Sequence, residues 1–238
     1  MVSLLSLSSL IFSVGCLIRI LKYPRYNLFT GVLKRWIAAG FAGLIVGAVS
    51  QASAAPRLVV LGDSLTAGYG LPQDQAFPVL LETAIRARGT AVTVINAGVS
   101  GDTTAGGLAR LNWALASDPT HVLVELGAND MLRALDPEVT RKNLETIIVR
   151  LRARGIKVML AGMYAAPNLG KMYAEAFRTL YTDLARKYGI MLYPFFLDGV
   201  AAERGLNQKD GMHPNEKGVA IIVERMLPSV LKFLDGKE

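Results

Sequence analysis

Short continuous apolar runs alternate with longer helix-like stretches from Arg57 to the C-terminus. The first of these runs, 58–61, is typical of a strand that is buried on both faces. The expected strands span 58–61, 91–96, 121–126, 156–162 and 190–193. The expected helices span 77–88, 104–116, 136–154, 171–188 and 214–234. Asp136 as a cap and Pro137 in the first turn favour a helix start. Three of the expected helices end at a glycine, namely Gly89, Gly155 and Gly189.

This β-α alternation predicts an α/β fold with a mostly parallel, five-stranded sheet and helices on both faces. Ligands of such sheets bind at the carboxyl ends of the strands. Three polar, glycine-containing segments follow expected strands directly, namely 62–64, 96–102 and 127–130. We therefore expect these three segments to share one edge of the sheet.

The first 54 residues form a leader with two apolar stretches. Lys34 and Arg35 precede an uncharged stretch that ends in Ala52-Ser53-Ala54. This order of basic, apolar and small residues predicts a secretory signal peptide over 32–54, cleaved after Ala54. The mature domain would then be 55–238 and would be periplasmic or secreted. A retained membrane anchor is the alternative, although the apolar centre is shorter than the roughly 20 residues of a full span.

The segment 1–31 is an additional apolar stretch that signal peptides rarely follow. Either the start of translation is wrongly assigned, or this segment is a further membrane helix that would associate the chain with a membrane. It contains Cys16, the only cysteine. A mature chain without cysteine excludes disulfides, thiolate metal sites and a cysteine nucleophile.

The high net charge belongs largely to the leader. The chain has 26 Lys and Arg against 19 Asp and Glu, a net charge of +7. Five of the basic residues and none of the acidic ones lie before residue 55, so the remainder has 21 against 19 and a net charge of +2. The remainder also lacks a basic run with interleaved aromatics, and we expect no nucleic-acid partner.

The candidate chemistry lies in two segments about 150 residues apart. Ser64 stands where the first apolar strand breaks into a turn, and Asp210 and His213 lie three positions apart near the C-terminus. A serine hydroxyl becomes a nucleophile when a base takes its proton, and the base works best when a third group orients it. We interpret Ser64 as nucleophile, His213 as base and Asp210 as its orienting carboxylate. The alternatives are a turn cap for Ser64 and a helix cap for Asp210.

Acyl transfer also requires donors for a developing oxyanion. The backbone N–H groups of Ser64 and Gly101 and the side-chain amide of Asn129 follow strands on the expected edge, although glycine and asparagine there are often only turn residues. Asp63 is interpreted as a cap for nearby N–H groups. The other histidine of the domain, His121, is interpreted as structural or surface.

These residues resemble the sequence blocks of the GDSL, or SGNH, hydrolases. The blocks are Gly62-Asp63-Ser64-Leu65, Gly101 within 96–104, Gly127-Ala128-Asn129-Asp130 and Asp210-Gly211-Met212-His213-Pro214. Four blocks in order and at suitable spacing are specific, and the likeness covers 57 to the C-terminus. Within the family, the sequence resembles the small periplasmic bacterial thioesterase and lysophospholipase type, which is often labelled arylesterase. The resemblance implies a flavodoxin-like three-layer α/β/α sandwich, the triad Ser64, Asp210 and His213, and an oxyanion hole of Ser64, Gly101 and Asn129.

The expected activity is hydrolysis of small-molecule aryl or short acyl esters, and also of thioesters or lysophospholipids, without a metal or organic cofactor. Tyr69, Met163, Tyr164 and Leu169 are candidates for an apolar wall over the acyl chain, with an ordinary connecting loop as the alternative. A monomer is expected. Two other functions stay open: a carbohydrate esterase or acyltransferase on the same scaffold, and a non-enzymatic flavodoxin-like module that holds phosphate at a helix N-terminus.

Overall fold

The computed structural model describes residues 55–236. The expected segment 1–31 and the expected signal peptide 32–54 lie outside the described residues. Within the described part of the chain, no helix combines the length and apolar character needed to cross a membrane.

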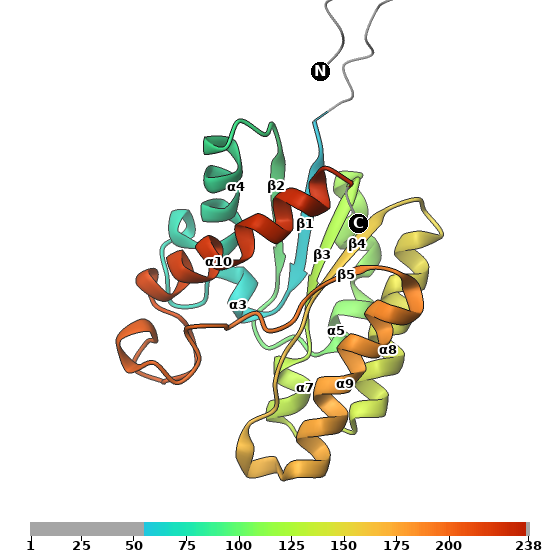
Figure 1. Ribbon diagram of the computed structural model, residues 1–238, viewed down its shortest axis with the longest axis vertical. Coiled ribbons are helices and arrows are strands. Elements are labelled where there is room, and N and C mark those ends of the chain that lie inside the picture. Colours follow the sequence, from blue (N-terminus) through green and yellow to red (C-terminus); the bar gives the residue numbers. More distant parts are fainter. Residues whose placement is uncertain (1–54, 237–238) are drawn as a thin grey trace, which may run out of the picture. The chain divides into compact units, whose positions relative to one another are not determined.

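Five parallel strands form a single sheet in the described chain (Figure 1). They are β1 (Arg57–Gly62), β2 (Thr93–Gly98), β3 (His121–Glu125), β4 (Lys157–Ala161) and β5 (Met191–Tyr193). Their order in the sheet is β2-β1-β3-β4-β5, which is the flavodoxin-like order. The predicted α/β class and the predicted five-stranded parallel sheet are therefore confirmed.

Helices cover both faces of the sheet and make the three layers (Figure 1). The main helices are α4 (Phe77–Ala87), α5 (Thr104–Ala109), α8 (Pro137–Arg152), α9 (Lys171–Tyr188) and α10 (Glu216–Leu234). The helices α4 and α10 pack against each other on one face, while α5, α8 and α9 follow one another on the other face. The apolar side chains of β1 and β3 lie between these layers and are almost completely buried.

The helix predicted over 104–116 is wrong as a single element. It consists of three short pieces, α5, α6 (Leu111–Ala114) and the 3-10 turn η3 (Leu115–Ser117). Arg110 lies at the junction of the first two pieces, with φ −97° and ψ 10°, which departs from the regular α-helical geometry. Gly106 and Gly107 lower the helix propensity of this segment, so that tertiary contacts decide where the helix is interrupted.

Two short helices that the sequence did not predict begin at the carboxyl ends of strands. These are α3 (Ser64–Ala67) after β1 and α7 (Ala128–Leu132) after β3. In the register of the sheet, Gly62 at the end of β1 lies opposite both Gly98 of β2 and Glu125 of β3. The three polar segments that follow these strands therefore leave the sheet at one edge, as expected.

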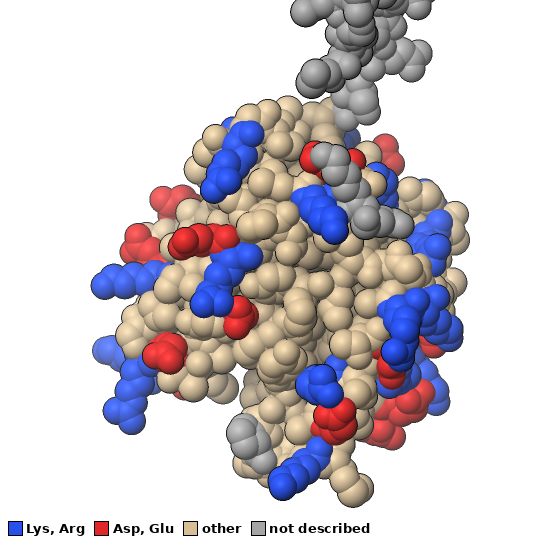
Figure 2. Space-filling model, viewed as in Figure 1, with Lys and Arg blue, Asp and Glu red and all other residues tan. Residues whose placement is uncertain are grey.

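Charged side chains of both signs lie next to one another on the surface over the helices (Figure 2). Among the described residues, seven ion pairs join Arg or Lys to a carboxylate near the surface, as in Arg178 with Glu175 and Arg225 with Asp198. Exposed pairs of this kind contribute little to stability, roughly 0 to 1 kcal/mol each. The fold is held mainly by the apolar layers on the two faces of the sheet.

Candidate active site

Ser64 begins the short helix α3, directly after β1. Asp63 caps this helix, because its carboxylate accepts a hydrogen bond from the backbone N–H of Leu65 at 3.0 Å. The turn is tight: a Cβ atom added at Gly62 would lie 2.1 Å from the hydroxyl oxygen of Thr66. Only glycine fits there. The turn thus leaves the Ser64 side chain partly exposed at the carboxyl edge of the sheet.

His213 and Asp210 reach Ser64 from the loop before α10. The Nε2 atom of His213 lies 2.9 Å from Ser64 Oγ, and its Nδ1 atom lies 2.6 Å from Asp210 Oδ2. The other carboxylate oxygen of Asp210 accepts the backbone N–H groups of Met212 and His213. These backbone bonds, and then the bond to the His213 ring, lower the pKa of Asp210 to about 2. Asp210 is therefore ionised at neutral pH.

The loop that carries His213 is tied to the segment that follows Ser64. The Nε2 atom of Gln208 donates to the carbonyl oxygens of Tyr69 at 2.7 Å and of Pro214 at 3.0 Å. The ring of Tyr69 packs on the imidazole of His213, with ring centroids 4.5 Å apart. Asn215 caps α10 through Gly218 N–H, so that Asp210 does not act as the cap of that helix.

The three candidate oxyanion groups line the same cavity as Ser64 and His213. Gly101 has φ 84°, a left-handed conformation that favours glycine. The Nδ2 atom of Asn129 donates to Asp63 Oδ2 and to the carbonyl oxygen of Asp102, each at 3.0 Å. The structure thus brings Ser64, Gly101 and Asn129 to one cavity. The contact with Asn129 is a second role for the Asp63 carboxylate, which its interpretation as a cap did not include.

Two buried carboxyl groups lie beneath the serine turn, and sequence reasoning missed the second. Glu125 at the end of β3 accepts hydrogen bonds from the Thr66 hydroxyl at 2.6 Å and from Asp63 N–H at 3.4 Å. Burial, with the negative charge of Asp63 close by, raises the pKa of Glu125 well above its ordinary value, which favours the neutral carboxyl group. Burial also raises the pKa of Asp63 to about 6.

A cavity of ≈ 620 Å³ opens beside Ser64, and most of the side chains that line it are apolar. The predicted wall residues Tyr69, Met163 and Tyr164 line it, whereas Leu169, in the 3-10 turn η4 (Pro167–Leu169), is not among the lining residues. Sequence reasoning missed several others. They are Met131, Leu132, Phe195, Leu197 and Met212. Phe195 stacks on Tyr164 with ring centroids 4.3 Å apart, a pairing of two loops that no local pattern reveals.

His121 lies far along β3 from this edge. It is buried, packs edge-on against Phe233 at 5.0 Å between ring centroids, and its Nδ1 atom lies 2.8 Å from the Thr120 hydroxyl. Burial lowers its pKa to about 4, with a smaller contribution from the positive charge of Lys157. Its place in the core agrees with the interpretation of His121 as a structural residue.

Hydrogen bonds link an aspartate to a histidine and the histidine to a serine at the carboxyl edge of a parallel sheet. This arrangement is typical of a serine hydrolase. Comparison with known proteins identifies the family. The model of the GDSL-like Lipase/Acylhydrolase family matches residues 60–221, and this chain belongs to that family. The resemblance inferred from the four sequence blocks is thereby confirmed, as is the enzyme class.

Named relatives of this chain are hydrolases. An arylesterase of Vibrio mimicus is 41% identical over 190 residues, which cover 79% of this chain and 94% of that protein. Thioesterase 1/protease 1/lysophospholipase L1 of Escherichia coli K12 is 38% identical over 177 residues, 74% of this chain and 84% of that protein. The structure of the psychrotrophic esterase EstA of Pseudoalteromonas sp., inhibited by monoethylphosphonate, superposes with a TM-score of 0.72 at 35% identity, over 76% of this chain and 99% of that one.

Proposed function

We propose that this chain is a serine esterase in which Ser64 is the nucleophile, His213 the general base and acid, and Asp210 the group that orients His213. The observation that carries this proposal is the continuous line of contacts from Asp210 through His213 to Ser64, at 2.6 Å and 2.9 Å. An ionised Asp210 beside Nδ1 holds the proton on that nitrogen, so that Nε2 is free to accept the proton of the serine.

The reaction has two half-steps. In the first, Ser64 Oγ attacks the ester carbonyl carbon while His213 Nε2 takes the hydroxyl proton, and the tetrahedral intermediate collapses when His213 gives this proton to the departing alcohol. In the second, His213 takes a proton from water as the water attacks the acyl-enzyme. Collapse of the second intermediate returns the proton to Ser64 Oγ and releases the carboxylic acid.

The negative charge that develops on the carbonyl oxygen needs donors that are already in place. We assign this role to the N–H groups of Ser64 and Gly101 and to the side-chain amide of Asn129. Their common cavity and the left-handed backbone of Gly101 support this assignment. Removal of one such donor typically lowers kcat by about 100- to 1,000-fold.

The proposal is tested with p-nitrophenyl acetate and butyrate. Ser64→Ala and His213→Ala should each lower kcat by roughly 1,000-fold or more, because the triad acts as a unit. His121→Gln is the matched control, since His121 is the other histidine of the described residues and lies away from the cavity. Hydrolysis by Ser64→Ala at the wild-type rate would end the proposal.

Covalent labelling gives an independent readout of the nucleophile. A fluorophosphonate should modify the wild-type protein at Ser64, as identified by peptide mass spectrometry, and should fail to modify Ser64→Ala. Labelling at another residue would contradict the assignment. A non-enzymatic phosphate-binding module would show no covalent labelling at all.

The apolar cavity supports a single acyl chain as the substrate group that the enzyme recognises. A cavity of ≈ 620 Å³ lies within the range of small-molecule sites, roughly 300 to 1,000 Å³. We therefore propose aryl and acyl esters as substrates. A profile of kcat/KM against acyl length, from acetate to palmitate, should rise while the chain fills the cavity and fall afterwards. A flat profile would contradict a role for the cavity in acyl binding.

A thioester or lysophospholipid substrate is the second candidate, because the similar Escherichia coli protein is named as a thioesterase and lysophospholipase. An acyl-CoA and a lysophosphatidylcholine with the preferred acyl length separate the possibilities. Turnover of either compound, abolished by Ser64→Ala, would extend the activity to that class. A carbohydrate esterase would instead prefer acetylated sugars to aryl esters of the same acyl group.

We also propose that the leader exports the domain and is removed after Ala54. The basic, apolar and small-residue order of 32–54 supports this proposal. N-terminal sequencing of the protein recovered from the cell envelope or medium should begin at Ala55. A mature protein that keeps 32–54 would indicate a membrane anchor instead.

A further inference from the structure

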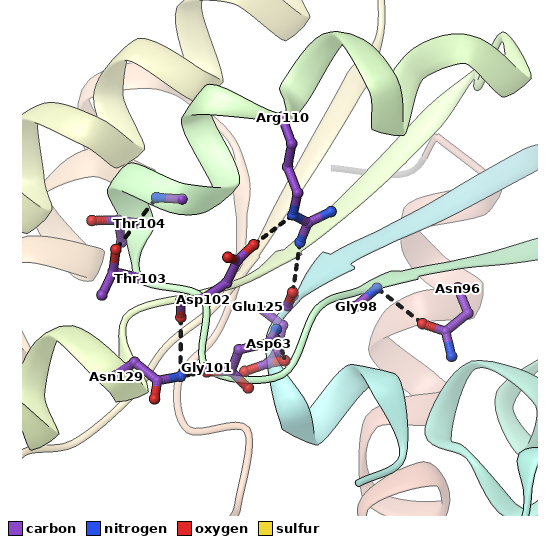
Figure 3. A network of polar contacts seen from close by, with 12 residues as sticks. Asp63, Asn96, Gly98, Gly101, Asp102, Thr103, Thr104, Arg110, Glu125 and Asn129 are labelled. Atoms are coloured by element: carbon purple, nitrogen blue, oxygen red, sulfur yellow. Dashed lines mark hydrogen bonds and ion pairs between the residues drawn. The ribbon is translucent and has the colours of Figure 1, made fainter.

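The side-chain amide of Asn129 is held entirely by groups from other turns. Its Nδ2 atom donates to Asp63 Oδ2, on the turn after β1, and to the carbonyl oxygen of Asp102, on the turn after β2 (Figure 3). Asn129 itself follows β3. The orientation of this amide thus depends on how three separate turns are placed relative to one another.

Arg110 connects two of these turns. Its Nε atom donates to Asp102 Oδ2 at 2.5 Å, and its Nη2 atom donates to the carbonyl oxygen of Gly62 at 2.8 Å (Figure 3). Gly62 precedes Asp63 directly. The contacts therefore close a ring that runs from Arg110 to Asp102, to Asn129, to Asp63 and back to Arg110 through the backbone of Gly62.

The guanidinium of Arg110 lies in a mostly buried setting. Its side chain is only 16% exposed and that of Asp102 17%, so the ion pair is largely shielded from water. The ring of Trp113 lies 5.8 Å from the guanidinium carbon, although Trp113 is one of the most exposed aromatic side chains of the described residues. A planar guanidinium with fixed donors is suited to bridging a carboxylate and a carbonyl at defined geometry.

We infer that Arg110 is a positioning residue of the oxyanion hole: by holding Asp102 and the carbonyl oxygen of Gly62, it sets the distance between the turn of Ser64 and the turn of Gly101, and with it the direction of the Asn129 amide. The inference rests on the proposed function, in which Ser64, Gly101 and Asn129 stabilise the oxyanion. Arg110 itself touches neither the substrate nor the reacting atoms.

The resting contacts explain why this placement affects the rate. Both N–H groups of the Asn129 amide are occupied by protein acceptors before substrate binds. An oxyanion is a stronger acceptor than the neutral carbonyl of Asp102, so it can take over that N–H while Asp63 keeps the other. The exchange is efficient only if the Asp102 carbonyl lies close to the position that the oxyanion will occupy, and Arg110 fixes this carbonyl through the Asp102 side chain.

The helix interruption fits this role. Arg110 lies between α5 and α6, where the expected continuous helix breaks. Gly106 of α5 leaves the necessary room, because a Cβ atom there would lie 2.5 Å from Asp102 Oδ1. The same contact supplies a second means of displacing Asp102 without removing the arginine.

The first test is Arg110→Ala, assayed with p-nitrophenyl butyrate. We expect kcat to fall about 10- to 100-fold, less than on loss of a donor, with KM within about threefold of wild type, because the defect lies in transition-state stabilisation. Arg110→Lys keeps the charge without the two-pronged geometry and should restore only part of kcat. Arg86→Ala is the matched control: Arg86 also bonds a carbonyl oxygen, that of Val92, and a carboxylate, that of Glu82, away from the cavity.

A double-mutant cycle with Asn129→Ala separates a positioning role from a general structural one. If Arg110 acts through the Asn129 amide, most of the effect of Arg110→Ala on kcat should disappear in the Asn129→Ala background. Multiplicative losses, an unchanged kcat in Arg110→Ala, or an effect on KM alone would overturn the inference. If Asn129→Ala itself leaves kcat unchanged, the oxyanion assignment of the proposed function is wrong, and this result is distinguishable from the others.

Gly106→Ala keeps the proposal testable if Arg110→Ala does not fold, which circular dichroism would show. Alanine is favoured over glycine in a helix, so the fold should persist while the new methyl group moves the Asp102 carboxylate away from Arg110. We expect kcat to fall several-fold, with a smaller relative loss in the Asn129→Ala background. A kcat equal to wild type in a folded Gly106→Ala protein would overturn the inference.

Discussion

Asp210 and Asp63 are two carboxylates close to the same serine, and their environments differ in opposite ways. Asp210 lies in an exposed loop, where backbone N–H groups lower its pKa to about 2. Asp63 is completely buried beneath the turn, and burial raises its pKa to about 6. Asp210 contacts the base, His213, whereas Asp63 contacts the amide of Asn129.

The difference indicates that hydrogen bonds to a carboxylate lower its pKa and keep it ionised at this site, whereas burial raises the pKa and favours the protonated form. Asp210 is held by residues two and three positions further along the chain, so its charge depends on local geometry alone. Asp63 contacts a side chain 66 positions away, and its backbone N–H donates to Glu125 beneath it. Substitution of each carboxyl group by its amide therefore tests how far the two environments differ in function.

The largest effect is expected for Asp210→Asn. The amide cannot stabilise a protonated imidazole and favours the wrong tautomer of His213, so kcat should fall by roughly 1,000- to 10,000-fold at pH 7. Stopped-flow or steady-state assays with an aryl ester measure this loss. A loss below tenfold would show that His213 does not need Asp210.

A smaller effect is expected for Asp63→Asn. An asparagine can accept from Leu65 N–H or from Asn129, but its amide nitrogen cannot accept the other bond. Loss of one buried hydrogen bond of about 1 to 1.5 kcal/mol corresponds to about a tenfold lower kcat if the Asn129 amide turns away. An unchanged kcat would show that Asp63 serves only as the cap of α3.

Asp63→Asn also has a signature in stability. The pKa of Asp63 is about 6 in the folded state, whereas an unfolded Asp has a pKa near 3.8. Between these two pH values the folded state binds the proton more tightly, so the free energy of unfolding falls as the pH rises. In the variant this fall should be absent. Urea unfolding at pH 4, 5, 6 and 7 measures it, and an identical slope in both proteins would contradict the raised pKa.

Almost no change in activity is expected for Glu125→Gln. Burial raises the pKa of Glu125 well above its ordinary value and so favours the neutral carboxyl group, which glutamine matches in shape and charge. The kcat should stay within about threefold of wild type, a change of about 0.7 kcal/mol, which is less than one typical hydrogen bond. A loss as large as that of Asp210→Asn would show that Glu125 is ionised in the working enzyme.

The smallest effect on catalysis is expected for His121→Gln, which leaves both carboxylates in place. The pKa of His121 is lowered to about 4, so its folded form stays neutral while the unfolded chain takes up a proton below about 6.5; stability is therefore lost as the pH falls from 6.5 to 4. The variant should lose less stability over this window, by about 1 to 2 kcal/mol after allowance for solvent near the ring. Thermal unfolding at pH 4.5 and 7 measures the difference, and equal acid sensitivity would contradict it.

The parts of the site that local sequence determines were predictable. Asp210 and His213 lie within one turn, and Ser64 follows a buried strand, so their chemistry and their common edge follow from spacing and topology. Four of the strands were also predictable, because each contains a continuous apolar run, whereas β2 contains Thr93 and Asn96 and begins two residues later than expected. The roles assigned to the triad and to the oxyanion groups stay predictions until the variants are assayed.

The parts that depend on distant contacts were not predictable. The buried position of Glu125 arises from the pairing of β3 with β1, and the break at Arg110 arises from its bonds to Asp102 and Gly62. The side chains that line the cavity were likewise not predictable. Phe195 lies on Tyr164 across two loops. Leu169 follows the same strand as Tyr164 but does not line the cavity. Residue type indicates an apolar loop but not which side chain turns inward.

The strand order has a consequence for changing the substrate. The groups proposed to break the ester bond follow β1, β2 and β3 or lie before α10, whereas Met163, Tyr164, Phe195 and Leu197 follow β4 and β5 at the far side of the sheet. Loops tolerate substitution better than the elements that they connect. An engineer could therefore randomise these four positions to select for another acyl group while leaving Asp210 and His213, further along the connection from β5 to α10, untouched.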